Sequence, residues 1–288
     1  MTEAPPLAQL RAWYAEELRF AGPIDSEVVV RAFAAVPRER FLGPGPWLSR
    51  SDTNRGGGYR VTPDADPRHV YHDVLFALDA SRRINNGAPS LWAYALDHVD
   101  LSPGERVLHL GCGTGYYSAV MAELVGAGGH VTAVERDADL ARRAAEALAL
   151  WPWVQAVQGD GAQFDGGAQD AIVVSAGATH PPPLWLDALR PGGRLLFPLT
   201  SERLGGYMLK VTRGEAHDRL GAGILCRAWF IPFIGARDVA LDARLATQIE
   251  VGNADLVRSL RRDHHPSDDS CWLHGGGFCL SLLDWQSG

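Results

Sequence analysis

The chain has 288 residues, of which 46% are hydrophobic and 21% are charged. This composition is typical of a globular protein and excludes a disordered or fibrous chain. The net charge is −7, from 27 basic and 34 acidic residues, and the sequence contains no block of five Lys or Arg residues. We therefore expect no nucleic-acid partner, because a phosphate backbone is recognised by clustered positive charge.

We recognise no targeting signal in the sequence, and the cysteines are scattered. Both observations favour a cytoplasmic protein without a membrane partner. The N-terminal residues lack a basic region followed by an apolar one, and no stretch of about 18 apolar residues occurs. The four cysteines, Cys112, Cys226, Cys271 and Cys279, form no CxxC pair. They predict four reduced thiols rather than a disulfide framework or a zinc site. The sequence leaves the oligomeric state open.

The N-terminal region predicts two helices followed by a long loop. Apolar residues recur at helical spacing over residues 7–20 and 25–36, and Asp25 or Ser26 is a suitable N-cap for the second helix. Residues 43–68 are rich in Gly, Pro, Asp and Arg, which favours a loop.

From residue 105 onward, apolar runs alternate with helical segments. We predict strands at 107–110, 130–135, 154–158, 170–175 and 194–199. We predict helices at 116–125, 137–150 and 183–190. This alternation is typical of a doubly wound α/β fold, in which helices cover both faces of a parallel sheet. Two later strands, at 206–213 and 224–234, complete a mostly parallel seven-stranded sheet.

The C-terminal part is predicted to form a helix near 240–262 and a short apolar tail over 278–285. We expect the aromatic residues Trp272, Phe278 and Trp285 to anchor this extension on the core. The predicted organisation has three parts: N-terminal helices and loop over residues 1–80, a nucleotide-binding core over 81–240, and the C-terminal helix and tail over 241–288.

The strongest functional signal is the sequence VLHLGCGTGYY, in which Gly111, Gly113 and Gly115 join a buried strand to a helix. Glycines at such a turn let the backbone approach a ligand, and the helix N-terminus offers free N–H groups. The spacing differs from the dinucleotide fingerprint G-x-G-x-x-G, because the third glycine comes one position early and Tyr116 follows it. An NAD-dependent oxidoreductase is therefore disfavoured.

Two carboxylates at the ends of the following strands fit S-adenosylmethionine (SAM). Glu135 ends the next strand and can accept both ribose hydroxyls, and Asp160 ends the third strand and can accept the adenine amino group. His109, two residues before the first glycine, is either a hydrogen-bonded core residue or a catalytic residue, and we place it with the residues around the cofactor. The predicted cofactor-binding residues are His109, Gly111, Gly113, Gly115, Glu135, Asp160 and Gly161.

Further motifs along the chain match one enzyme family. They are VPRERFLG at 36–43, Tyr71-His72-Asp73, Ala88-Pro89, GDG at 159–161, DAIVVSAGA at 170–178 and LRPGGRLLFPL at 189–199. With the glycine loop, they resemble the protein-L-isoaspartate O-methyltransferases, a branch of the class I SAM-dependent methyltransferases, over roughly residues 10–240. The resemblance implies an enzyme that uses SAM to methylate a carboxylate of a peptide or protein, isoaspartyl or aspartyl. Alternatives are a methyltransferase of small molecules and a non-catalytic SAM-binding module.

The acceptor loop departs from the family pattern. Where the family carries T-I-S-x-P, this chain has Asn85-Asn86-Gly87-Ala88-Pro89, so that Gly87 stands at the place of the active-site serine. We therefore expect isoaspartyl peptides to be poor substrates. Asn85 and Asn86 either replace the serine hydroxyl as donors to the acceptor or form an ordinary turn. No general base is required, because an ionised carboxylate is already a nucleophile and the sulfonium is already activated.

Three other groups allow two interpretations each. The segment 175–177 either lines the acceptor side of the cofactor site or is a tight turn after a strand. Arg82 and Arg83 either attract a carboxylate substrate or are simply solvated. Asp263-His264-His265 and His274 match no known spacing of metal ligands, so we expect no bound metal.

Overall fold

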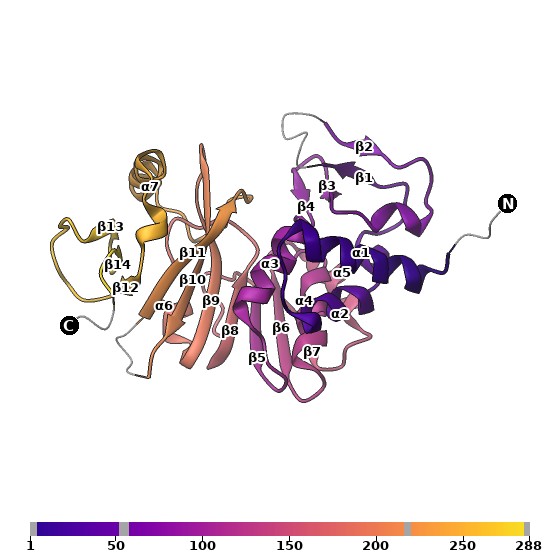
Figure 1. The fold of residues 1–288 in the computed structure, drawn as a ribbon, viewed down its shortest axis with the longest axis horizontal. Helices are drawn as coiled ribbons and strands as arrows, with labels where there is room; N and C mark the ends of the chain where they lie inside the picture. The colour runs from indigo at the N-terminus through magenta and orange to yellow at the C-terminus, as the bar shows by residue number, and fades with distance from the viewer. Residues whose placement is uncertain (1–4, 52–57, 216–219, 285–288) are drawn as a thin grey trace. The chain divides into compact units, whose positions relative to one another are not determined.

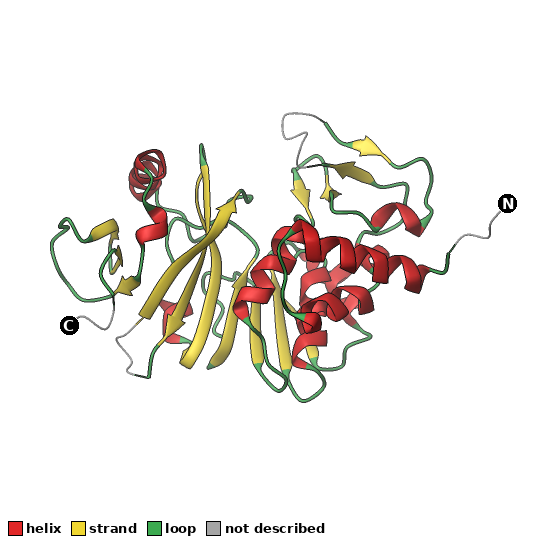
Figure 2. Cartoon of the chain, viewed as in Figure 1, coloured by secondary structure: helices red, strands yellow, loops and turns green. Residues whose placement is uncertain are grey.

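The computed structural model describes residues 5–51, 58–215 and 220–284. Its contacts divide the chain into two compact units, one of residues 1–105 and 112–158 and the other of residues 106–111 and 159–288. Both units contain helices and strands, and Figure 2 distinguishes them by colour. Within the described residues, no helix combines the length and the apolar character needed to span a bilayer.

Three helices of the first unit form its N-terminal layer. They are α1 (Leu7–Ala21), α2 (Glu27–Ala35) and α3 (Pro89–Val99). The N-cap of α2 is Ser26, whose side chain accepts the Val29 N–H, so one of the two predicted caps is confirmed. The helix α3 was not predicted; Asp73 of the Tyr71-His72-Asp73 motif accepts the Ser90 N–H in its first turn.

The predicted loop 43–68 contains two short strands, which corrects the sequence analysis. The strands are β1 (Leu48–Arg50) and β2 (Arg60–Val61), and the 3-10 helix η3 (Pro67–Val70) follows. They belong to an antiparallel sheet of order β2-β1-β3-β4 with β3 (Leu75–Asp79) and β4 (Ile84–Asn85). Strands this short carry no detectable apolar alternation. Residues 52–57 of the loop lie outside the described residues.

Arg38 ties this sheet to the N-terminal helices of the same unit. It lies in the 3-10 helix η1 (Arg38–Phe41) and is fully buried. Its guanidinium donates to the carbonyls of Val70, His72 and Val74 at 2.7–2.8 Å. Three backbone carbonyls that precede β3 thus accept from the two terminal nitrogens of the guanidinium, whereas its buried Nε has no hydrogen-bond partner among the described residues.

The remainder of the first unit consists of two helices and two strands. These are α4 (Tyr116–Val125), β6 (His130–Glu135), α5 (Ala138–Leu148) and β7 (Val154–Gln158). The strands β6 and β7 are parallel. All four agree with the predicted ranges within two residues, because each shows an uninterrupted apolar pattern bounded by a turn.

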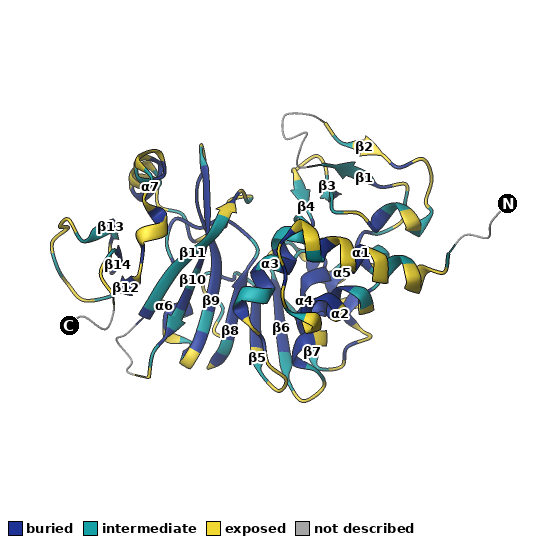
Figure 3. Cartoon of the chain, viewed as in Figure 1, coloured by how far each residue is buried: buried dark blue, intermediate teal, exposed yellow. Residues whose placement is uncertain are grey.

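The second unit contains the rest of the predicted core. In chain order its elements are β5 (Arg106–Leu110), β8 (Gln169–Val174), α6 (Pro183–Asp187), β9 (Leu189–Ser201), β10 (Gly205–Arg213) and β11 (Leu220–Ala228). The strands β5, β8 and β9 are parallel, whereas β9, β10 and β11 are antiparallel. Residues 171–174 of β8 are fully buried (Figure 3), as expected for a strand covered on both faces.

The C-terminal extension differs from its prediction. The helix α7 (Val239–Val251) ends eleven residues before the predicted boundary, where Gly252 adopts φ +91°. The 3-10 helix η4 (Ala254–Leu256) and three strands follow, β12 (Ser259–Arg261), β13 (Cys271–Gly275) and β14 (Phe278–Ser281). They continue the antiparallel edge in the order β11-β12-β14-β13 (Figure 1). The predicted final core strand also ends early, at Ala228 rather than at residue 234.

Two of the three aromatic anchors can be placed. Trp272 and Phe278 are 3% and 5% exposed. The Trp272 ring packs edge-on against Tyr207 of β10, and its indole N–H donates to the Gly252 carbonyl. Their predicted anchoring role is confirmed within the second unit, and Trp285 lies outside the described residues.

Candidate functional site

Glu135 is held in one orientation by the glycine loop. Its carboxylate accepts the Gly113 N–H at 2.8 Å through Oε2 and the Asp137 N–H at 3.0 Å through Oε1. Burial raises the pKa of the Glu135 carboxyl, and the backbone N–H groups of Asp137, Gly113 and Arg136 oppose this rise by stabilising the charged form. A carboxylate has about four lone-pair sites, so Glu135 keeps the capacity to accept from a hydroxyl group of a ligand.

The loop glycines adopt a backbone that other residues rarely tolerate. Gly111, Gly113 and Gly115 have φ of +73°, +58° and +92°. A Cβ at Gly115 would lie 2.7 Å from Cδ1 of Leu148, so that a side chain there would separate α4 from α5. No side chain caps α4. A helix N-terminus of this kind is suited to a ligand that accepts hydrogen bonds.

The two asparagines of the acceptor loop have different surroundings. Asn85 accepts the Gly87 N–H at 2.9 Å, which is the hydrogen bond of an Asx turn. Asn86 is 8% exposed, and its Oδ1 accepts the Phe76 N–H at 2.8 Å. Its amide Nδ2 is buried and has no hydrogen-bond partner among the described residues. Asn86 therefore presents a fixed, unsatisfied donor, whereas the Asn85 oxygen shapes the turn.

Trp92 occupies the space that a side chain at position 87 would need. Gly87 has φ +75°, and a Cβ there would lie 2.6 Å from Nε1 of Trp92. The indole stacks on Tyr117 at 4.9 Å between ring centroids, and the Tyr117 hydroxyl donates to the Gly87 carbonyl at 3.2 Å. Sequence reasoning missed both aromatic residues, because only their contacts connect them with the acceptor loop.

In the second unit, Asp160 and Gly161 begin the turn that follows β7. The Asp160 carboxylate accepts the Ala162 N–H at 3.0 Å. The Gly161 carbonyl accepts the indole N–H of Trp185 at 2.8 Å. A Cβ at Gly161 would lie 3.0 Å from the Phe233 ring. Trp185 and Phe233 thus lie against this turn, and aromatic rings can pack against a flat base.

His109 is part of the core of the second unit. It is completely buried, and its Nε2 is hydrogen-bonded to the Ser175 hydroxyl at 2.7 Å. Burial lowers the pKa of the His109 imidazole to about 3, so the ring is neutral at physiological pH. These contacts favour the core interpretation, in which His109 fixes the end of β8.

Arg82 lacks the freedom that an anion-attracting role would require. Its guanidinium forms ion pairs with Asp79, at 2.6 Å, and with Asp137. Arg83 is exposed and has φ +59°. The structure therefore joins Arg82 to a turn and to the N-cap of α5.

Comparisons with known proteins identify the family. The sequence profile described as protein-L-isoaspartate(D-aspartate) O-methyltransferase (PCMT) matches residues 60–237. The protein-L-isoaspartate O-methyltransferase of Aeropyrum pernix is 33% identical over 253 residues, which cover 85% of this chain and 86% of that protein. The one from Pyrobaculum neutrophilum is 37% identical over 211 residues, covering 69% and 88% respectively.

Solved structures show the same fold. A Plasmodium falciparum chain assigned to PCMT, solved in complex with S-adenosyl-L-homocysteine, has a TM-score of 0.62 at 19% identity and covers 78% of this chain and 98% of its own. A further protein-L-isoaspartate O-methyltransferase has a TM-score of 0.62 at 24% identity, covering 85% and 70%. The predicted α/β methyltransferase fold is thus confirmed. The chain belongs to the protein-L-isoaspartate(D-aspartate) O-methyltransferase family.

Proposed function

We propose that the chain transfers the methyl group of SAM to a carboxylate oxygen of a peptide or protein, at an isoaspartyl or aspartyl residue. The observation that carries the proposal is the Glu135 carboxylate held by the Gly113 N–H within a glycine loop. This arrangement places a hydrogen-bond acceptor for the ribose hydroxyls next to a glycine backbone that a ligand can approach closely. The family supplies the acceptor class, since relatives named for isoaspartyl methylation cover most of the chain.

The proposed cofactor contacts follow from the chemistry of each group. Glu135 accepts the ribose hydroxyls, Asp160 accepts the adenine amino group, and the loop 111–115 offers backbone N–H groups. Gly161, whose missing Cβ lets Phe233 pack against the turn, lies beside the base in this proposal. His109 acts through Ser175 as a positioning residue. The complex of the Plasmodium falciparum structure with S-adenosyl-L-homocysteine supports the choice of cofactor.

The reaction is a displacement at the methyl carbon. A carboxylate oxygen forms the new O–CH3 bond while the S–CH3 bond breaks and its electron pair stays on sulfur, giving a methyl ester and S-adenosyl-L-homocysteine. The ordinary carboxyl pKa of about 4 makes the acceptor anionic at neutral pH, so no proton has to be removed. The task of the protein is to align oxygen, carbon and sulfur and to exclude water.

The acceptor is held by the loop that contains Asn86. Its buried Nδ2 lacks a partner in the described structure, and a carboxylate oxygen would satisfy it. The oxygen of the same amide is already bonded to the Phe76 N–H, which fixes the amide orientation. Residues 175–177 line the acceptor side in this proposal.

The remaining assignments are also proposals. Residues 81–240 form the SAM-binding core, with residues 1–80 and 241–288 as additions to it. None of the four cysteines forms a disulfide, which supports a cytoplasmic location. The acidic net charge supports a peptide rather than a nucleic-acid partner.

Methyl transfer to matched peptides tests the function. The purified chain is incubated with methyl-labelled SAM and peptides of one sequence that carry isoaspartate, aspartate or asparagine at a single position, and methyl esters are detected as methanol released by base. Ester formation on a carboxylate peptide, absent from the asparagine peptide, supports the proposal. Labelling of small acids alone favours the small-molecule enzyme, and SAM binding without transfer favours the non-catalytic module.

A further inference from the structure

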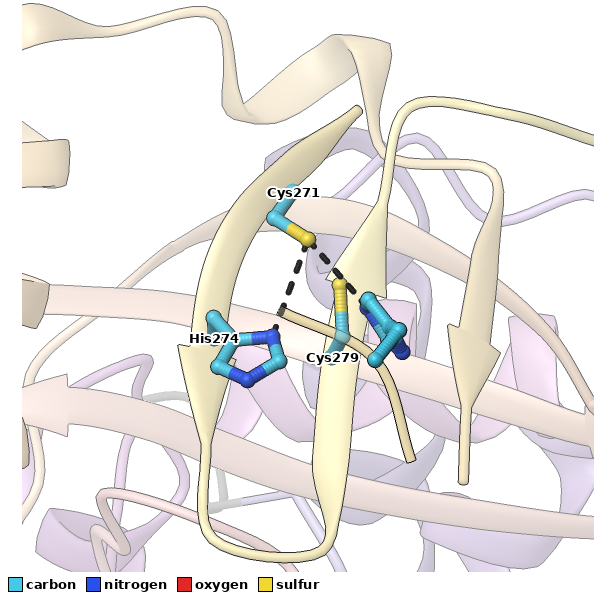
Figure 4. Close-up of side chains that lie close together, drawn as sticks. Cys271, His274 and Cys279 are labelled. Carbon is cyan, nitrogen blue, oxygen red and sulfur yellow. Dashed lines mark hydrogen bonds between the residues drawn. The ribbon is translucent and has the colours of Figure 1, made fainter. Parts of the chain in front are cut away.

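Four potential metal ligands gather in the C-terminal extension, outside the region matched by the family profile. They are His265, Cys271, His274 and Cys279, and their ligand atoms all lie within 4.8 Å of one another. Cys271 and His274 come from β13 and Cys279 from β14, with the three side chains turned toward one another (Figure 4). His274 and Cys279 face each other across the two strands.

The spacing of the ligand atoms fits one tetrahedral ion. Sγ of Cys271 lies 3.4 Å from Nε2 of His265 and 3.7 Å from Nδ1 of His274. Zinc bonds of about 2.3 Å to sulfur and about 2.0 Å to nitrogen place tetrahedral ligand atoms roughly 3.3–3.8 Å apart. The unliganded cluster is therefore close to the geometry that a zinc ion would impose.

The surroundings of His265 also favour a metal ligand. Its Nδ1–H donates to the Asp263 carbonyl at 3.0 Å, so the lone pair of Nε2 points at Cys271. A ligating histidine usually donates its second ring N–H to such an acceptor, which fixes the tautomer. The imidazole is 10% exposed and Cys279 is buried, which limits access of water to the cluster.

We propose that His265, Cys271, His274 and Cys279 bind one Zn²⁺ ion in a closed, structural site. Two thiolates and two imidazoles are a donor set that prefers zinc, and four protein ligands leave no open position for catalysis. The sequence analysis expected no metal because the histidines alone match no known spacing. In the folded chain, strand pairing places the two cysteines next to the histidines.

The ion would join segments that have little core of their own. The loop carrying His265 connects β12 to β13 and has no regular secondary structure. Zinc would fix this loop to the hairpin that holds Trp272 against Tyr207 and Phe278 against His180. A small extension of this kind gains stability from a metal because its apolar core is limited.

Metal analysis of the intact chain tests the proposal. Expressed in zinc-containing medium and passed through a desalting column, the wild-type chain should retain about one zinc ion per chain. Cys271→Ser and Cys279→Ser should each lower zinc retention at least about tenfold. Cys226→Ser and His264→Ala are matched controls outside the cluster and should keep the full amount. His274→Cys preserves a ligand and should retain zinc.

A cobalt spectrum keeps the proposal testable if the cysteine variants fail to fold. Wild-type chain stripped by chelator and reloaded with Co²⁺ should show thiolate-to-cobalt charge transfer and the visible bands of a tetrahedral ion. The chelator should also lower the melting temperature, and zinc should restore it. Any of three results would overturn the proposal. They are a wild-type chain that retains no zinc, a disulfide between Cys271 and Cys279 in the chain purified under reducing conditions, and a cobalt spectrum typical of a six-coordinate ion.

Discussion

In the proposed cofactor site, Glu135 combines burial with a role that requires its charge. Burial raises the pKa of its carboxyl above the ordinary value. The ribose hydroxyls are donors and bind only the ionised form well. As the pH falls through the raised pKa, protonation competes with the cofactor. SAM affinity is therefore lost at a higher pH than for an ordinary glutamate, and it is fully present above that pKa.

We expect Glu135→Gln to weaken SAM binding by roughly 1.5–3 kcal/mol at neutral pH, the range for hydrogen bonds to charged groups. The SAM dissociation constant of Glu135→Gln should not change with pH, whereas that of the wild type should rise as the pH falls through the raised pKa of Glu135. Calorimetric titration measures both. Glu146→Gln, on the exposed face of α5, is the control. Wild-type affinity in Glu135→Gln would remove this residue from the cofactor site.

Replacing Asn85 or Asn86 by aspartate distinguishes a role in forming the turn from a role in contacting the methyl acceptor. An aspartate oxygen can still accept the Gly87 N–H at position 85 and the Phe76 N–H at position 86. Only at position 86 does the change remove a buried donor without a partner in the described structure. Poor placement of an acceptor can cost about a hundredfold in rate.

We therefore expect Asn86→Asp to slow methyl transfer by up to about a hundredfold, with SAM affinity nearly unchanged, and Asn85→Asp to remain active. Single-turnover rates, SAM dissociation constants and melting temperatures distinguish the two roles. Equal rates in both variants would show that Asn86 does not orient the acceptor.

The backbone conformation and the neighbours of Gly87 leave no room for a side chain. We therefore expect that a serine at this position will not restore the role of the serine in the family motif. The positive φ costs roughly 1–2 kcal/mol for a residue with a Cβ, and that Cβ would meet Trp92 at 2.6 Å. At about 2–4 °C per kcal/mol, Gly87→Ser and Gly87→Ala should both melt several degrees below the wild type, as differential scanning fluorimetry can measure. A serine variant that keeps its stability and gains isoaspartyl activity would contradict this account.

At the scale of elements, Arg38 shows how one side chain joins segments of the first unit. Its three carbonyl acceptors lie more than thirty positions away in the sequence. A lysine carries one compact ammonium in place of the planar fork, so it cannot reach all of these carbonyls. Leaving a buried acceptor unsatisfied costs about 1–3 kcal/mol.

We expect Arg38→Lys to lower the melting temperature by roughly 5–10 °C, at about 2–4 °C per kcal/mol. Arg31→Lys, on the exposed side of α2, should leave it unchanged. Thermal denaturation followed by circular dichroism tests both variants. A wild-type melting temperature in Arg38→Lys would mean that the three hydrogen bonds do not hold the β3 segment in place.

For the whole molecule, we expect the acceptor loop to determine which peptides are methylated. With Gly87 and Trp92 in place of the serine hydroxyl, one hydrogen bond to an isoaspartyl substrate is lost. That loss is worth about 1.5 kcal/mol, or roughly tenfold in kcat/KM. We expect no preference for isoaspartyl over aspartyl in peptides of one sequence, as competition assays with both peptides can measure. A clear isoaspartyl preference in those assays would refute the expectation.

Local patterns determined much of the fold. The glycine loop, Glu135 at the end of β6 and the ranges of α4, β6 and β7 follow from short stretches in which periodicity and turn residues agree. Such stretches encode helix or strand almost independently of the rest of the chain. Where the local pattern was interrupted, as at Gly252 after α7, the predicted boundary was wrong.

Contacts between distant residues depended on the tertiary structure. The Trp92 indole beside Gly87, the His109–Ser175 hydrogen bond and the cluster around Cys271 have no local signature. Each arises when packing or strand register brings side chains together, as the pairing of His274 with Cys279 shows. The sequence by itself thus determined the methyltransferase family and its glycine loop. Only the tertiary structure decided which side chains meet, because register and packing are properties of the whole chain.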